Sequence, residues 1–457
     1  MSNNKQKANF GSRFGYIMVA AGAAIGLGNI WKFPYLAYGG GGGAFVVVYI
    51  ILCIVLGHPV VEMETAIGRY AKTNAIDAYG VINPKWKFAG VVNVLCTVMI
   101  DMYYIIVSGY VLKYAVDFLI GSDFAPDSAT YYMDFISDPV EPLIYAGILM
   151  IVTVVLLSFG ITELVESVTK VIMPLLFVLL VTCGIWALFI SEGAMEGLKF
   201  YLIPDWGNFT WKAVADACMQ VMFSVGIGWS IFTTLGASVA DTNNIRKDSI
   251  WVTICDTCVA LTAGFVIIPS VVGSGSQMTA GPSLIFLAMT DIFGKFPGGR
   301  FIGFFFFTAL IFAVLSTYFT ILEIPVKCVE EKLKVNHRVA TVATATFIFA
   351  GGIICSLSQG NGLLSHIRLP WWAFGDGIIY YNIYDWFDVF SGYVLLPLGC
   401  LLTTIYCCKV WGYKGYEEEL TKGGRDGILS KYDRVVMTVV VPILTLIVIL
   451  NCFGFIK

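Results

Sequence analysis

The chain has few charged residues and few histidines. Only 13% of its 457 residues are charged, whereas a soluble domain carries about 25%, and it has three histidines. The scarcity of charge leaves no basic face for a nucleic acid, so no nucleic-acid partner is expected. The histidines, His58, His337 and His366, are scattered, and neither HExxH nor GxSxG occurs. No enzyme signature is therefore present, and the chain is not predicted to be an enzyme.

Apolar residues are abundant instead and make up 58% of the chain. About 20 apolar residues suffice to cross the hydrocarbon core of a bilayer. Eleven stretches meet this requirement: 13–38, 42–69, 88–120, 142–159, 166–191, 213–236, 248–273, 298–327, 339–357, 384–408 and 432–455. We therefore predict an all-α polytopic membrane protein with eleven transmembrane helices.

Lys and Arg predict the orientation, because they concentrate on the cytoplasmic side of a membrane. With the N-terminus inside, the cytoplasmic segments collect most of these residues, whereas loop Gly121–Glu141 has five acidic residues and no base. Eleven spans then place the C-terminus outside the cell (plasma) membrane. Residues 282–294 and 367–379 are apolar but too short to span, and are expected to fold back over the external face. Gly39–Gly43 is expected to be a tight turn.

The first span contains a stretch that a simple anchor would avoid, AGAAIGLGNIWKFP at Ala21–Pro34. Glycine costs about 1 kcal/mol against alanine inside a helix. An amide or ammonium group in lipid also needs partners. We predict that this helix breaks in mid-membrane and offers its backbone to a ligand.

The sixth span repeats the anomaly in QVMFSVGIGW, Gln220–Trp229. Interrupted helices at matching places in two halves indicate a transporter site at the interface of an inverted repeat. The predicted segments are 1–12 (cytoplasmic), 13–192 (first five-helix repeat), 193–212 (external loop), 213–408 (second five-helix repeat), 409–431 (cytoplasmic loop) and 432–457 (eleventh helix and external C-terminus).

Oxygen-bearing residues accompany these breaks. Ala313, Ser316 and Thr317 share one helix face by their i, i+3, i+4 spacing, and Asp256 lies deep in the seventh span. They suit a hard cation such as Na⁺, which prefers oxygen ligands. For Ser316 and Thr317 the alternative is hydrogen bonding between helices. An intramembrane carboxylate without a role is costly, which favours the ligand interpretation for Asp256.

Further polar residues suggest a substrate contact and two gates. Asp101 and Tyr104 lie one turn apart on the third span, and Tyr104 could bond a substrate carboxylate or simply pack. The charged residues form two possible pairs, Lys32 with Asp388 outside and Lys7 with Glu331 inside. Taken singly, such residues are most often solvated helix ends, and pairing is expected only if both members flank a pathway.

With these motifs assembled, the chain closely resembles the neurotransmitter:sodium symporter family, in its bacterial amino-acid transporter branch. The match runs from about Lys7 to beyond Asp388. It rests on AGAAIGLGNIWKFP, the GGGAF of Gly41–Phe45, the ExxxGRY of Glu64–Tyr70, Tyr103–Tyr104, the QVMFS of Gln220–Ser224, and Asp385 with Asp388.

The resemblance implies two sodium sites and one amino-acid site. The first sodium site would use Ala24, Asn29, Ser224 and Asp256, together with the substrate carboxylate. The second would use Gly22, Ile25, Ala313, Ser316 and Thr317. The substrate carboxylate would meet Leu27, Gly28 and Tyr104, and its amino group would meet carbonyls of Ala23 and Phe223. The remaining pocket residues would be Ile100, Asp101, Gly226, Trp229, Thr317 and Ile321.

The sequence departs from the family's leucine-transporter pattern at several points. Asp256 replaces an asparagine and Ala260 a glutamate, so the carboxylate has moved by one turn and chloride is not expected to be required. Leu164 replaces the glycine of the family's Gly-x9-Pro motif that ends at Pro174, and Phe10 replaces a gating tryptophan.

Asp101 is unusual for this fold, and two interpretations of it stay open. It could bind a hydroxyl or amine on the substrate, or it could be protonated and bonded to a neighbouring helix. We expect Na⁺-coupled symport of an amino acid, most simply a neutral one, by a monomer or dimer in the lipid bilayer. The alternatives are a substrate with a polar or cationic side chain bound by Asp101, and a substrate sensor with little net transport.

Overall fold

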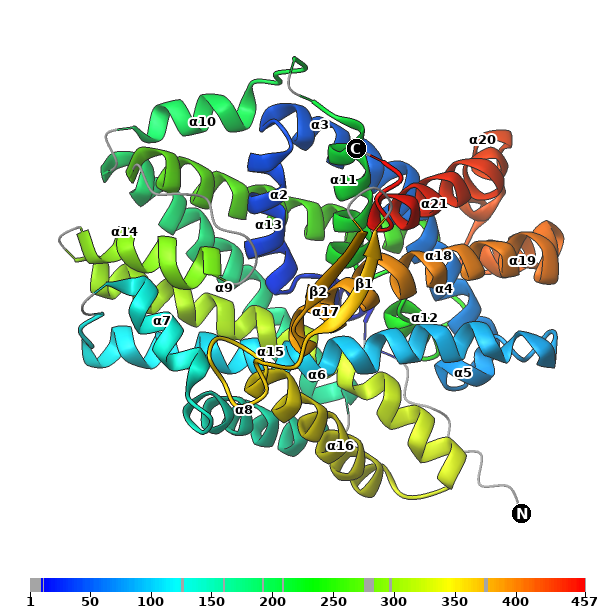
Figure 1. Cartoon of the computed structure of the whole chain (residues 1–457). Helices are drawn as coiled ribbons and strands as arrows, with labels where there is room; N and C mark the ends of the chain where they lie inside the picture. The colour runs from blue at the N-terminus through cyan, green and yellow to red at the C-terminus, as the bar shows by residue number, and fades with distance from the viewer. Residues whose placement is uncertain are drawn as a thin grey trace.

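The computed structural model describes residue 10 and residues 12–124, 127–158, 161–190, 193–207, 209–274, 283–295, 298–373 and 377–456. Within these ranges the protein is a bundle of helices with one short β-hairpin (Figure 1).

The elements up to residue 236 are α1 (Arg13–Ala24), η1 (Gly28–Lys32), α2 (Phe33–Gly39), α3 (Gly43–Leu52), η2 (Cys53–Gly57), α4 (His58–Ala71), α5 (Ala75–Ala78), η3 (Pro84–Trp86), α6 (Lys87–Ile120), α7 (Ser128–Ser137), α8 (Glu141–Ser158), α9 (Ile161–Ile190), α10 (Ala194–Leu202), α11 (Trp211–Val225) and α12 (Ile231–Gly236). The later ones are α13 (Ile245–Ser274), η4 (Leu284–Met289), α14 (Thr290–Lys295), α15 (Gly299–Leu333), α16 (His337–Leu357), β1 (Leu369–Ala373), β2 (Gly377–Tyr381), α17 (Ile383–Phe390), η5 (Ser391–Leu395), α18 (Leu396–Ile405), η6 (Tyr406–Gly412), α19 (Tyr413–Thr421), η7 (Arg425–Gly427), α20 (Lys431–Val435), η8 (Val436–Val440) and α21 (Val441–Cys452).

The membrane-spanning character expected from the sequence is confirmed. Among the described residues, eight helices are long and apolar enough to cross a bilayer, or nine if the bent pair α1 and η1–α2 is one span. Two of the eleven expected spans, the one that contains α9 and the one that contains α11 and α12, are not among these helices. The chain is therefore an all-α polytopic membrane protein, and the number eleven stays a prediction.

The third and tenth expected spans are longer in the structure than in the sequence prediction. The third helical segment begins at Pro84 rather than residue 88, where the Asn83 side chain accepts the Lys85 N–H (3.1 Å). The tenth continues as far as Thr421 instead of ending at residue 408. Its last helix, α19, is polar enough to resemble a loop, but it buries Tyr416 and Glu419.

Helices α6 and α15 form the centre of the bundle. The most apolar stretch of the segment with α6 is 78% buried, and that of α15 is 72% buried. The corresponding stretch of α20–α21, at the periphery, is only 28% buried. Gly109 allows α8 to approach α6, because a Cβ there would lie 2.5 Å from the Ala146 backbone nitrogen. The two central helices therefore supply a scaffold against which the broken helices rest.

Both short apolar loops fold back onto the bundle, as expected for caps. The first forms η4 and α14, whose Phe293 packs edge-on against Phe118 of α6 (5.9 Å between centroids). The second forms the antiparallel hairpin β1–β2, which Figure 1 shows in front of α17. Trp371 of β1 stacks on Phe453 (5.5 Å) and donates its indole N–H to the Cys452 carbonyl (3.3 Å).

The glycine run between α2 and α3 forms a packed turn. Gly41 and Gly42 have positive φ angles, +90° and +60°, which L side chains rarely adopt. Gly42 also pairs with Pro204 in an isolated antiparallel bridge. The run therefore packs the α2–α3 turn against the segment that follows α10.

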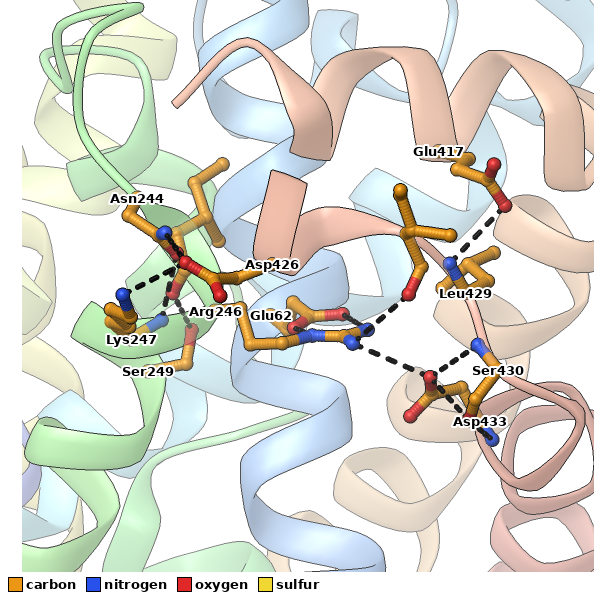
Figure 2. A network of polar contacts seen from close by, with 12 residues as sticks. Glu62, Asn244, Arg246, Lys247, Ser249, Glu417, Asp426, Leu429, Ser430 and Asp433 are labelled. Atoms are coloured by element: carbon orange, nitrogen blue, oxygen red, sulfur yellow. Dashed lines mark hydrogen bonds and ion pairs between the residues drawn. The ribbon is translucent and has the colours of Figure 1, made fainter. Parts of the chain in front are cut away.

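An ion-pair network joins the last helices to α4 and α13. Figure 2 shows the Arg246 guanidinium between Glu62 and Asp433, with contacts of 2.8 and 3.4 Å. Asp433 also accepts the N–H and hydroxyl of Ser430 (2.8 Å each), which caps α20. Nearby, a hydrogen bond from Lys247 lowers the pKa of the exposed Asp426 carboxyl.

Replacing Arg246 by Ala is expected to destabilise the protein, because it leaves the buried Glu62 carboxylate without its cation. Removing one partner of a buried pair costs about 3 kcal/mol or more. The matched control is Lys247→Ala, whose pair with Asp426 is exposed (54% and 50%). Thermal unfolding in detergent measures both variants. Equal midpoints for the two variants would contradict a structural role for the Arg246 network.

Candidate functional site

The first helix breaks where the sequence predicts. Helix α1 ends at Ala24 and η1 begins at Gly28, with a bend of 57° between them. Two of the freed amides find partners: the Gly26 N–H donates to Asn29 Oδ1 (3.2 Å), and the Leu27 N–H donates to the Tyr104 hydroxyl (3.3 Å). Side chains thus compensate the broken backbone, as lipid requires.

The second break lies between α11 and α12. Gly226 and Gly228 take positive φ angles of +84° and +86°, and the Gly228 N–H donates to the buried Glu64 carboxylate (2.7 Å). The Thr97 hydroxyl bonds the Trp229 carbonyl. Sequence reasoning gave Glu64 no role. A carboxylate inside a predicted span was the signal that could have revealed it.

Asp256 joins the two broken helices. Its carboxylate accepts hydrogen bonds from the Asn29 amide (2.6 Å) and the Ser224 hydroxyl (2.9 Å), and all three residues are buried. Tyr49, which was not predicted, donates to Ser224 (3.1 Å). Three of the four residues expected at the first sodium site therefore meet.

The fourth residue of that set, Ala24, lies beside the second break. A Cβ on Gly226 would be 3.9 Å from the Ala24 Cα. Between the two breaks, Gln220 donates its side-chain amide to the Gly28 carbonyl (3.0 Å). The broken helices are therefore held together by side chains from α11 and α13.

A second group of oxygens lies between α1 and α15. The Thr317 hydroxyl is 3.2 Å from the Gly22 carbonyl oxygen and 2.9 Å from that of Ile25, and Ser316 bonds the Ala313 carbonyl (2.9 Å). All five predicted residues thus lie in one buried cluster of carbonyl and hydroxyl oxygens. Such an arrangement suits a hard cation.

The predicted substrate-carboxylate residues lie between these clusters. A Cβ on Gly26 would be 3.0 Å from both the Tyr104 and the Thr317 hydroxyl oxygens, and one on Gly28 would be 2.6 Å from the Phe223 ring. Only glycine leaves this space open. The amides of Leu27 and Gly28 are at the N-terminus of η1, where the helix dipole favours an anion.

The residues predicted to surround the substrate side chain are buried, but fewer hydrogen bonds connect them than connect the residues of the two oxygen clusters. The residues expected there, Ala23, Ile100, Asp101, Trp229 and Ile321, are all inaccessible to solvent or nearly so. The Trp229 ring stacks on Phe223 (5.9 Å between centroids), and its indole nitrogen is 3.5 Å from where a Gly226 Cβ would lie.

Lys32 closes one end of the site. Its ammonium lies 3.2 Å from the Asp388 carboxylate and 4.5 Å above the Phe223 ring. Tyr103, which was given no role from the sequence, donates to the same carboxylate (3.2 Å). The expected pair Lys32–Asp388 therefore forms, and it lies next to the Phe223 ring.

Glu331 marks the opposite end. It accepts hydrogen bonds from Thr73 (2.8 Å) and from the backbone and side chain of Asn74 (2.9 and 2.7 Å). Lys7, its predicted partner, lies outside the described residues. The side chain of Leu164 does too, whereas Pro174 is inside α9 and Phe10 packs on Tyr16 (5.3 Å).

The kinds of side chain present limit which metal ions the site can bind. Within the described ranges, no three His, Cys, Asp or Glu side chains come together as they do in transition-metal sites. The clusters instead combine one carboxylate with amide, hydroxyl and backbone oxygens. They are suited to binding alkali cations beside an anionic group.

The chain matches a known family of membrane transporters along most of its length. The model of the Sodium:neurotransmitter symporter family matches residues 7–122 and 139–456. The chain is 32% identical over 460 residues to the uncharacterized sodium-dependent transporter YhdH of Bacillus subtilis, covering 99% of each chain. A similar uncharacterized sodium-dependent transporter of Haemophilus influenzae is 32% identical over 426 residues, covering 89% of this chain and 91% of the relative.

A solved structure is similar along almost the whole chain. It is the crystal structure of MhsT in complex with L-phenylalanine, with a TM-score of 0.88 and 31% identity over 98% of this chain and 100% of that one. Sequence, fold and broken-helix site thus agree: the chain belongs to the sodium:neurotransmitter symporter family and is a sodium-coupled transporter, not an enzyme.

Proposed function

We propose that this protein carries a neutral amino acid into the cell together with two sodium ions, by alternating access. The observation that carries the proposal is the meeting of both broken helices around one buried carboxylate, Asp256, next to the backbone amides of Leu27 and Gly28. The bound L-phenylalanine of MhsT supports an amino acid as the class of substrate.

The first sodium ion would bind at Ala24, Asn29, Ser224 and Asp256. The Asp256 carboxylate would supply the charge that offsets the cost of a cation in low dielectric. The carboxylate of the substrate, on the Leu27 and Gly28 amides and the Tyr104 hydroxyl, would complete the shell. Ion and substrate would then bind more tightly together than singly, which is the basis of coupling.

The second sodium ion would bind at Gly22, Ile25, Ala313, Ser316 and Thr317. Because Gly22 and Ile25 belong to the first broken helix and the other three to α15, the ion would hold α1 against the scaffold. Its departure would free α1 to move, opening the end of the site that lies near Glu331.

The substrate itself would be enclosed by residues of four helices. Its amino group would meet the carbonyls of Ala23 and Phe223, and its side chain would contact Ile100, Asp101, Gly226, Trp229, Thr317 and Ile321. The pair Lys32–Asp388 would form the outer gate, and Lys7–Glu331 the inner one. With the orientation that the Lys and Arg distribution favours, the N-terminus would lie in the cytoplasm and the C-terminus outside, with the protein in the plasma membrane.

Transport is expected to be independent of chloride. Asp256 provides a fixed negative charge within 2.9 Å of the Ser224 hydroxyl, so a mobile anion has no charge to supply there. A second anion would instead be repelled by the carboxylate in this buried setting.

Sodium dependence can be measured as uptake of labelled amino acids into proteoliposomes. An inward Na⁺ gradient is expected to drive accumulation. Ser316→Ala with Thr317→Ala should raise the half-saturating Na⁺ concentration about tenfold or more, because hydrogen-bonding and ligand groups for a charge are lost. Thr341→Ala, which removes a buried hydroxyl of α16 bonded to His337, is the matched control.

Accumulation without Na⁺ would contradict the proposal. So would Na⁺-dependent binding with no accumulation, which describes a sensor rather than a carrier.

Chloride independence is tested in the same vesicles by replacing chloride with gluconate. Uptake by the wild type is expected to stay unchanged. Asp256→Asn, which keeps the shape and removes the charge, is expected to lose most uptake in gluconate and to regain part of it in chloride. Loss of wild-type uptake in gluconate would show that Asp256 does not replace the anion.

A further inference from the structure

Asp101 is the polar residue to which the sodium and carboxylate sites assign no role. It is fully buried in α6, and neither of its carboxyl oxygens has a hydrogen-bond partner among the described residues. A buried polar group without a partner is rare, and an ionisable one inside a membrane protein is costly. The part of the chain that the structure describes therefore leaves the Asp101 carboxyl available to a ligand.

The neighbouring helix does not supply a partner. The hydroxyl groups of Tyr104 and Tyr318 are both within electrostatic range of Asp101. Neither hydroxyl is a hydrogen-bond partner of Asp101: the Tyr104 oxygen accepts the Leu27 N–H (3.3 Å), and the Tyr318 hydroxyl is directed at the Met150 sulfur (3.8 Å). Within the described residues, no hydrogen bond therefore ties the Asp101 carboxyl to a neighbouring helix.

The position of Asp101 places it beside the proposed substrate. It lies next to Ile100 and one turn from Tyr104 on α6. Tyr104 in turn stacks on Tyr318 of α15 (6.1 Å, 7° between planes). A substrate whose carboxylate reaches the Leu27 amide would extend its side chain toward this part of α6.

A second unpaired polar group belongs to the same proposed pocket. Among the described residues, the buried indole N–H of Trp229 has no hydrogen-bond partner, and it lies beside Gly226. The pocket therefore offers an unpaired acceptor at Asp101 and an unpaired donor at Trp229. A hydroxyl group both donates and accepts hydrogen bonds, so it matches this combination.

We propose that Asp101 determines specificity for neutral amino acids with a side-chain hydroxyl group, by accepting the hydroxyl proton in a hydrogen bond. Trp229 donates to the same hydroxyl oxygen or to a water beside it. The inference rests on the proposed function, because it presumes that the amino-acid carboxylate binds at Leu27 and Gly28. It goes beyond that function by naming the substrate side chain.

The physical reason for selectivity is the cost of leaving Asp101 unpaired. A site built to bond a hydroxyl discriminates strongly against the analogue that lacks it, because its buried polar group then stays without a partner. Tyrosine should therefore be preferred over phenylalanine, and threonine over valine, although valine has nearly the shape of threonine. We expect each preference to be about tenfold or more in uptake efficiency.

The test measures Na⁺-driven uptake of these four labelled amino acids and of lysine in proteoliposomes. Asp101→Ala is expected to abolish the preference within the better-transported pair, measured as the ratio of the two uptake efficiencies, whatever its effect on the absolute rate of uptake. Asp101→Asn, which keeps an acceptor oxygen but no charge, is expected to retain part of the preference. Tyr318→Phe is the matched control and should change neither selectivity nor thermal stability.

Each result distinguishes this inference from the proposed function. If the wild type accumulates no amino acid with Na⁺, the proposed function fails. If it accumulates phenylalanine or valine as well as their hydroxyl partners, or if Asp101→Ala leaves the preference unchanged, only this inference fails. If the wild type instead prefers lysine and Asp101→Asn removes that preference, the group that Asp101 binds is a cationic side chain and not a hydroxyl. Destabilisation by both Asp101→Ala and Tyr318→Phe would assign Asp101 to a helix contact.

Discussion

The need to satisfy freed backbone groups away from water governs this structure. Two helices break inside the bundle, and each break releases amides and carbonyls that would cost several kcal/mol if left bare. The protein compensates them with a few side chains: Asn29 and Tyr104 at the first break, Glu64 and Thr97 at the second. Asp256 then bonds to Asn29 and to Ser224, so one carboxylate connects both breaks. The binding groups are oriented by the same bonds that make the breaks tolerable.

The rest of the fold keeps these bonds in place. Helices α6 and α15 are buried at the centre, and each contributes to the site: Tyr104 from α6, and Ser316 and Thr317 from α15. The β1–β2 hairpin and η4–α14 pack on the bundle as short caps. At another side, Arg246 ties α20 to α4 and α13 (Figure 2). Ion pairs thus help to attach α20, whereas the end of α21 is held by the stacking of Trp371 on Phe453.

The sequence carries much of this information, but unequally. The breaks could be predicted because glycine, asparagine and lysine are costly inside an apolar membrane helix, and most of the helix bounds followed from apolar length. The roles of Tyr49 and Tyr103 could not, because each depends on a contact with a residue far away in the chain. For Glu64, the carboxylate inside an apolar span signalled a role, but its partner Gly228 is also distant in the chain. The extension of the tenth segment to Thr421 was missed for a different reason. Helix α19 has a polar sequence, and its buried face is revealed by tertiary contacts, such as those of Glu419 with Arg69 and of Tyr416 with Glu62.

Gly26 has a consequence for how ion and substrate can influence each other. Its missing side chain leaves a gap that a single methyl group would fill, 3.0 Å from both the Tyr104 and the Thr317 hydroxyl oxygens. Tyr104 belongs to the proposed carboxylate site and Thr317 to the second oxygen cluster, so the two proposed sites meet at this glycine. A small shift at either hydroxyl is transmitted to the other by direct contact. The two sites can therefore influence each other without intermediate residues, because both hydroxyls border the same glycine backbone.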